Sequence, residues 1–105
     1  MTSDREHGRS ELLDRRARVP DHVVHRDFPG ETVILNLESG QYHGLNDTAR
    51  RMLAALEDAD TIGSAAMALA TEFGVPRTEI EHDLSGLCRA LADRGLVELD
   101  DVRRA

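Results

Sequence analysis

The sequence predicts an α+β fold in which a three-stranded antiparallel sheet is followed by three helices. Apolar residues alternate with a period of two between residues 23 and 45, and from residue 49 onwards they recur with a period near 3.6. Glycine, proline and asparagine separate the segments. Strands followed by helices are typical of a small sheet covered by helices on one face. In this order the unit has the shape of a winged helix-turn-helix with its wing placed first.

The predicted strands are residues 23–28, 32–37 and 41–45, which are short and rich in β-branched or aromatic residues. Pro29-Gly30 separates the first two strands as a turn. Glu38-Ser39-Gly40 fits a tight hairpin between the second and third, with Gly40 free to adopt a positive φ.

Three helices follow, and each has a start or stop signal. Asn46 is a good N-cap for the first helix, and Thr61 caps a second helix that ends at Gly74. A third helix starts around residues 76–78, where Thr78 and Glu81 have capping-box spacing, and it ends at Gly95. Residues 96–99 then form one more short strand or pack against the domain.

The chain is expected to hold one domain with tails at both ends. Residues 1–20 are predicted to be a disordered or weakly helical N-terminal tail, residues 21–100 the domain, and residues 101–105 a C-terminal tail. After residue 20 the chain carries eight arginines against sixteen acidic residues, a net charge of −8. Such a surface repels nucleic-acid phosphates and attracts basic partners.

Composition also narrows the cellular setting. Cys88 is the only cysteine, so no intramolecular disulfide forms and a reducing compartment is expected. No apolar run approaches the about 20 residues of a membrane span, and the first twenty residues lack the apolar stretch of a signal peptide. A cytoplasmic protein without membrane partners is therefore expected.

Catalytic motifs are not found. No two of the five histidines have the i, i+4 spacing of a helical metal site, and His22 and His25 point to opposite faces of a strand. Cys88 lies on an apolar helical stripe without an adjacent base, which favours a structural or pocket-lining thiol. Gly-rich phosphate loops are also missing. We therefore expect no enzyme activity, no metal and no cofactor.

One continuous stretch, residues 35–46, contains the hairpin and the run Tyr42-His43-Gly44-Leu45-Asn46. It is followed by Ala49, Leu53 and Leu56, and the chain closes on Asp83-Leu84, Leu87, Leu91 and Gly95-Leu96-Val97. In this order the motifs resemble those of the PqqD-like proteins, the recognition elements for ribosomally made and post-translationally modified peptides. The resemblance covers roughly residues 22–99. It departs from many relatives in lacking a tryptophan near the closing glycine.

The resemblance implies that the protein binds the leader segment of a precursor peptide. The segment would add as a further strand beside residues 41–45 and lie against the third helix. The implied peptide-binding residues are Gln41, Tyr42, His43, Gly44, Leu45, Glu79, Ile80, Asp83, Leu84, Leu87, Cys88 and Leu91. Because one helical stripe cannot face both core and groove, some of its leucines must belong to the core.

An acidic, free-standing member of this kind most resembles those that serve lasso-peptide pathways. There the protein would deliver the precursor to a separate leader peptidase, after which a cyclase acts. The quinone-cofactor branch of the family, which works with a radical enzyme, is the other destination that the resemblance allows.

Two alternatives come from other classes. The order of elements also fits a winged-helix transcriptional regulator, with the third helix as its recognition helix. That helix carries Glu79, Glu81, Asp83 and Asp93 against Arg77, Arg89 and Arg94, which is a poor face for a phosphate backbone. A plain dimerisation module is the second alternative.

Overall fold

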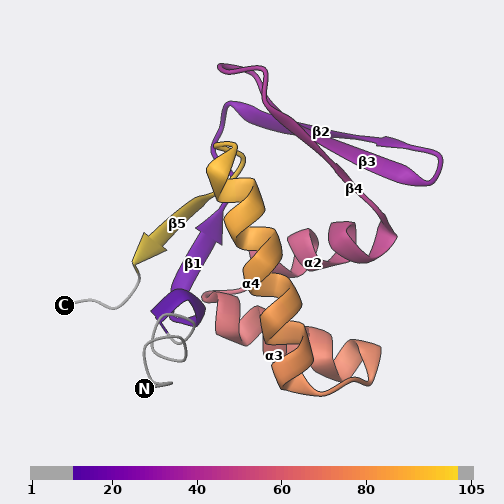
Figure 1. Ribbon diagram of the computed structural model, residues 1–105, viewed down its shortest axis with the longest axis vertical. Helices are drawn as coiled ribbons and strands as arrows, with labels where there is room; N and C mark the ends of the chain where they lie inside the picture. The colour runs from indigo at the N-terminus through magenta and orange to yellow at the C-terminus, as the bar shows by residue number, and fades with distance from the viewer. Residues whose placement is uncertain (1–10, 102–105) are drawn as a thin grey trace.

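The computed structural model describes residues 11–101, and it confirms the predicted α+β fold. A three-stranded sheet extends to one side of three helices, and a two-stranded sheet lies beside the helices near both chain ends (Figure 1). In chain order the elements are β1 (Arg15–Arg18), β2 (Val23–Phe28), β3 (Glu31–Asn36), β4 (Tyr42–Leu45), α2 (Asp47–Asp58), α3 (Ile62–Phe73), α4 (Arg77–Asp93) and β5 (Glu98–Asp101).

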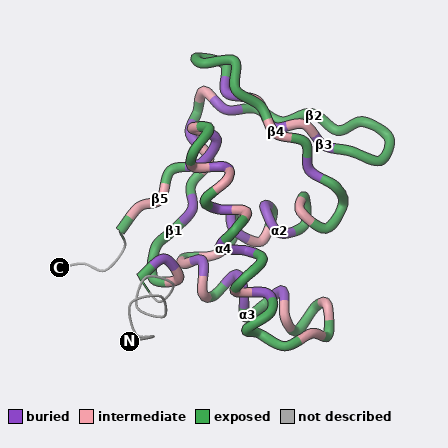
Figure 2. The backbone as a smooth tube through the Cα atoms, in the orientation of Figure 1, coloured by how far each residue is buried: buried purple, intermediate pink, exposed green. Residues whose placement is uncertain are grey.

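The larger sheet is antiparallel with β3 in its centre, so β2 and β4 are both edges. Ile34 of β3 pairs with His25 on one side and with His43 on the other. Thr32, Ile34 and Asn36 are buried, whereas the residues between them are only half-buried. Side chains alternate along a strand, so one face of the sheet packs on the helices and the other faces outward. Figure 2 shows that much of β2 and its turn is exposed.

The first two helices begin where the sequence predicts, and the second also ends there. The Asn46 side chain accepts a hydrogen bond from the Ala49 amide at 2.8 Å and caps α2. Thr61 caps α3 and forms a reciprocal capping box with Ser64. Gly74, with a left-handed φ of 69°, ends α3.

The predicted capping box at the start of α4 is wrong. The N-cap of α4 is Pro76, and no side chain caps the helix. Because the helix begins at Arg77, Thr78 already lies inside the first turn and is not in the N-cap position. Glu81 instead accepts a hydrogen bond from the Arg77 guanidinium at 2.8 Å.

Two apolar clusters form the core, and α4 contributes to both. Ile80, Leu84 and Cys88 pack with residues of β1, α2 and α3, whereas Leu91 packs with the sheet and with Leu96. Leu87 is half-buried and contacts both clusters. The helix thereby fixes the sheet relative to the other two helices.

The predicted N-terminal tail is wrong for the part that the structure describes. Arg15–Arg18 form β1, which pairs antiparallel with β5, so Ala17 lies opposite Leu99. Leu12 and Ala17 are buried in the apolar cluster that also contains Ile80, Leu84 and Cys88 of α4. Arg18 pairs with Glu98 and Asp100. Two buried residues and a distant partner strand therefore order a segment with few apolar residues. The predictions for residues 1–10 and 102–105 lie outside the described residues.

None of the helices within residues 11–101 is long and apolar enough to cross a membrane.

Removing residues 1–20 is therefore expected to destabilise the domain. The loss of β1 exposes the partners of Leu12 and Ala17 and leaves β5 unpaired. Loss of one buried leucine alone costs about 2–5 kcal/mol of unfolding free energy. Urea denaturation followed by circular dichroism should give a lower midpoint for a chain beginning at Asp21 than for one beginning at Glu11. Equal midpoints for the two chains would contradict the role of β1.

Candidate functional site

The outer edge of β4 carries backbone groups that the sheet does not use. The Asn36 amide donates to the Gln41 carbonyl at 2.8 Å, so Asn36 and Gln41 are a hydrogen-bonded pair. Along the antiparallel β3–β4 ladder, hydrogen-bonded and non-hydrogen-bonded pairs then alternate. With the register Leu35↔Tyr42 and Val33↔Gly44, the N–H and C=O groups of Tyr42 and Gly44 point away from β3. An edge of this kind is a template for a further strand.

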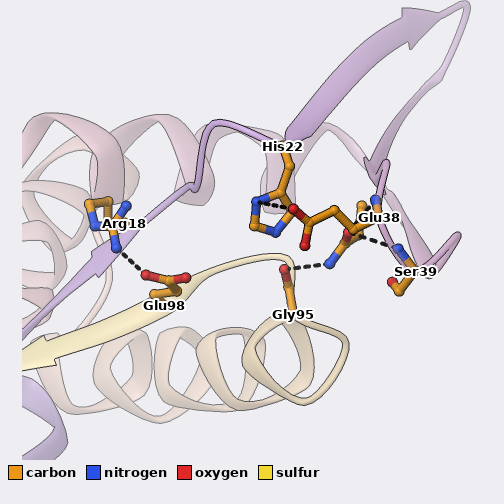
Figure 3. A network of polar contacts seen from close by, with 7 residues as sticks. Arg18, His22, Glu38, Ser39, Gly95 and Glu98 are labelled. Carbon is orange, nitrogen blue, oxygen red and sulfur yellow. Dashed lines mark hydrogen bonds and ion pairs between the residues drawn. The ribbon is translucent and has the colours of Figure 1, made fainter.

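A polar junction ties the base of the β3–β4 hairpin to the end of α4. The buried Asn36 side chain donates to the Gly95 carbonyl at 3.0 Å and accepts from the amides of Glu38 and Ser39 at 2.9 and 3.1 Å. Figure 3 shows Gly95 facing this turn. The side-chain nitrogen and oxygen of Asn36 both have hydrogen-bond partners, so the buried amide stabilises the fold.

Gly95 is required at this junction for two reasons. Its φ is 69°, which favours glycine, and a Cβ there would lie 2.9 Å from the Asn36 side-chain nitrogen. The Leu96 amide also donates to the Leu91 carbonyl at 2.8 Å, and the Gly95 amide donates to that of Ala92 at 3.0 Å. This pattern is a Schellman motif, which ends α4 and directs Leu96 into the core.

A second contact joins the same helix end to the edge strand. The Arg94 guanidinium donates to the Tyr42 carbonyl at 3.1 Å. This carbonyl is one of the outward groups of β4, so the Arg94 side chain reaches the open edge from its flank of α4. In Figure 1, β4 runs from near this end of α4 towards the start of α2.

Helical spacing places further residues on that flank of α4. Asp83, Leu87 and Ala90 lie 11, 7 and 4 positions before Arg94, so they share its side of the helix. Leu87 and Ala90 are half-buried and Asp83 is exposed. Among residues 11–101, neither Asp83 nor Arg94 forms an ion pair with another described side chain. The flank is therefore apolar in its middle, acidic towards the start of the helix and basic at its end.

The structure divides the predicted binding residues into three groups. The exposed ones are Gln41, Tyr42, Gly44, Glu79 and Asp83. The half-buried ones are His43 and Leu87. The remaining five are core residues: Leu45, Ile80, Leu84, Cys88 and Leu91, of which all but Ile80 are 0% exposed. The two apolar clusters enclose these five side chains, as was expected for some of the third-helix leucines but not for Leu45, Ile80 and Cys88.

Tyr42 lies elsewhere than predicted. It was expected in a pocket between the strand and the third helix, but it pairs with Leu35 on the outward face of the sheet and is 62% exposed. Leu35 in turn pairs with the exposed Val24 on β2, so the three side chains form one cross-strand row. On this face Tyr42 can contact only the outward side chains of an added strand.

Two residues of the candidate site, Arg94 and Asn36, had no predicted role in peptide binding. Arg94 precedes the glycine that stops α4, which is where a side chain can reach past a helix end. Asn36 is a polar residue in phase with the buried Thr32 and Ile34. The sequence signals for these two residues were the place of Arg94 beside the stop glycine and the place of Asn36 among the buried positions of its strand.

A groove lies between α2 and α3, away from β4. It has a volume of about 610 Å³, and alanines line it with a rim of charged residues. No predicted binding residue lines this groove. Arg51 on its rim is already engaged, since it pairs with Glu72 and lies 4.8 Å above the Phe73 ring.

Cys88 is enclosed, and burial raises the pKa of its thiol from 9.0 to about 12. The thiolate is the reactive form, so this side chain is a poor nucleophile at neutral pH. No group of three or more potential metal ligands occurs among the described side chains.

The raised pKa of Cys88 predicts slow alkylation of the folded protein. Iodoacetamide at pH 8 should label the thiol only at the rate of unfolding, and should label it rapidly in guanidinium chloride. Because the folded pKa exceeds the unfolded value of 9.0, the thiol's contribution to stability is complete below pH 9 and declines as the pH rises towards about 12. Fast labelling without denaturant would show that the side chain is accessible.

Comparisons with known proteins identify the family of the chain. Residues 31–97 match the family model described as coenzyme PQQ synthesis protein D (PqqD). The solved structure of TbiB1 in complex with the TbiA(beta) leader peptide is 33% identical, with a TM-score of 0.68 over 77% of this chain and 94% of that one. Lasso peptide synthetase B1 complexed with the leader peptide is 29% identical, with a TM-score of 0.69 over 79% and 98%.

A search of curated proteins found no significant match. The family match spans most of the described residues, from the start of β3 through α4, and so includes the hairpin, the edge strand and the closing Gly95-Leu96-Val97. The chain therefore belongs to the PqqD family and is a PqqD-like recognition element of the kind found in lasso-peptide biosynthesis.

Proposed function

We propose that this protein binds the leader segment of a ribosomally synthesised precursor peptide by adding it as a fourth strand to the edge of β4. The observation that carries the proposal is the outward edge at Tyr42 and Gly44, held beside α4 by the Asn36–Gly95 junction. Both solved relatives were captured with a leader peptide, which supports the same class of ligand here.

Backbone pairing would supply affinity that does not depend on peptide sequence. Tyr42 and Gly44 offer two N–H and two C=O groups, of which the Tyr42 carbonyl already accepts from Arg94, and each new hydrogen bond contributes about 0.5–1.5 kcal/mol net. Some of that free energy offsets the ordering of the peptide. Because the edge is already fixed by a rigid helix, the protein side needs little rearrangement.

Side chains on the two faces of the added strand would supply specificity. On the inner face the peptide would meet His43, Leu87 and Ala90, with Asp83 and Glu79 available to basic residues. On the outer face it would meet Tyr42, which pairs across strands with outward side chains. The contacts to Asp83 and Glu79 are exposed and should weaken with salt.

We further propose that the bound precursor is delivered to separate enzymes, a leader peptidase and then a cyclase. Strand addition supports this role because it holds only the leader segment and leaves the remainder of the precursor free. The similarity to lasso peptide synthetase B1 supports this pathway over the quinone-cofactor branch.

Replacing the outward amide of Gly44 tests strand addition. Gly44→Pro removes an N–H that the β3–β4 pair does not use and places the proline ring on the open edge, so binding should weaken about tenfold or more. The probe is a fluorescent peptide selected on the wild-type protein from a display library of random peptides that also contains the TbiA(beta) leader. Affinity is measured by fluorescence anisotropy.

Two controls accompany this variant. His25→Pro removes the matching outward amide on the opposite edge strand, β2, and should bind like the wild type. Gly44→Ala controls for the added Cβ, which would meet the movable Glu31 carboxylate. Wild-type affinity in a folded Gly44→Pro variant, or equal losses in both proline variants, would exclude β4 as the binding edge.

A further inference from the structure

We propose that Arg94 is a specificity-determining residue that pairs with a carboxylate of the bound peptide and sets its register on β4. This inference rests on the proposed strand addition and goes beyond it. Backbone pairing alone does not fix register, because each two-residue slip recreates the same hydrogen bonds. A charged contact at a fixed place along the strand would remove that ambiguity.

The position of Arg94 supports this role. It is exposed at the end of α4, and the only described hydrogen bond of its guanidinium goes to the Tyr42 carbonyl. That carbonyl is one of the four groups that an added strand would use, so the guanidinium already lies where the peptide must arrive. The Asn36–Gly95 hydrogen bond, one residue further on, holds the Arg94 backbone in place.

The chemistry of the guanidinium also supports it. An arginine has five N–H donors in a planar fork, and the Tyr42 carbonyl takes a single 3.1 Å contact. No described carboxylate pairs with Arg94, so its charge is available to a ligand, as are those of Arg26 and Arg89; of these three, only Arg94 contacts the edge of β4. A peptide carboxylate beside Tyr42 could therefore be bound while the guanidinium shares or releases the carbonyl.

The opposite charges of Asp83 and Arg94 give the proposed binding flank a direction. Asp83 lies eleven residues before Arg94, a distance of about 16 Å along the helix. An extended peptide spans this distance in about five residues. Residues whose side chains share one face of a strand are an even number of positions apart. The peptide's acidic and basic residues would therefore lie four or six positions apart.

Selection from the same random-peptide library tests the inference. Peptides selected on the wild type should share Asp or Glu at one position. Selection on Arg94→Glu should change that preference to Lys or Arg, and selection on Arg94→Gln should abolish it. Arg89→Glu is the matched control, since Arg89 is exposed on another side of the same helix, and it should keep the wild-type preference.

Affinities then measure the pairing directly. Replacing the preferred acid by Lys in one selected peptide should weaken binding to the wild type about fivefold to tenfold and strengthen binding to Arg94→Glu. If the selected peptides show no preference for an acidic residue, or if both Arg94 variants select the same acidic residue as the wild type, the role of Arg94 is overturned. Strand addition stands in either case. A wild type that selects no peptide would instead overturn the proposed function, and this inference with it.

Discussion

The buried hydrogen bond from the Asn36 side chain to the Gly95 carbonyl is the constraint on which the arrangement of the molecule depends. A buried amide is stable only if its donor and acceptor are both satisfied. Asn36 meets this condition by joining the β3–β4 turn to the end of α4, and no shift of the sheet along the helix would preserve all three contacts. The register between sheet and helices is thereby fixed.

The consequences extend in both directions along the chain. Upstream, the junction fixes where β4 begins and so where Tyr42 and Gly44 present their outward groups. Downstream, the Schellman motif at Gly95 directs Leu96 into the core and starts β5, which pairs with β1. Because α4 also packs in both apolar clusters, the sheet that carries the edge strand shares a core with the helices. A preformed edge lowers the ordering cost of binding, which is the physical basis of the proposed function.

Much of the fold was predictable because local signals agreed with each other. The change of period from two to 3.6 separated sheet from helices, and Asn46, Thr61 and Gly74 marked helix ends by side-chain or backbone chemistry. β1 was not predictable in this way, since its stability comes from pairing with Glu98–Asp101, far along the chain. The missing cap on α4 shows that spacing alone does not decide which residue is the N-cap.

The site was predictable in part. The edge strand and the third helix were identified through the family resemblance, but the division between core and groove was not. A helix that packs in two clusters buries a wide stripe, so Leu84, Cys88 and Leu91 are enclosed and only Leu87 reaches the flank. The outward position of Tyr42 could have been inferred, because Leu45 is buried and the period of two puts Tyr42 on the other face. Arg94 could not, since its role depends on where the hairpin meets the helix.

Amide hydrogen exchange, followed by NMR with and without a selected peptide, tests strand addition most directly. The outward amides of Tyr42 and Gly44 should exchange quickly in the free protein and become strongly protected in the complex, while that of His25 on the opposite edge should not change. Protection confined to β2 or to the α2–α3 groove, with Tyr42 and Gly44 still exchanging quickly, would contradict the account.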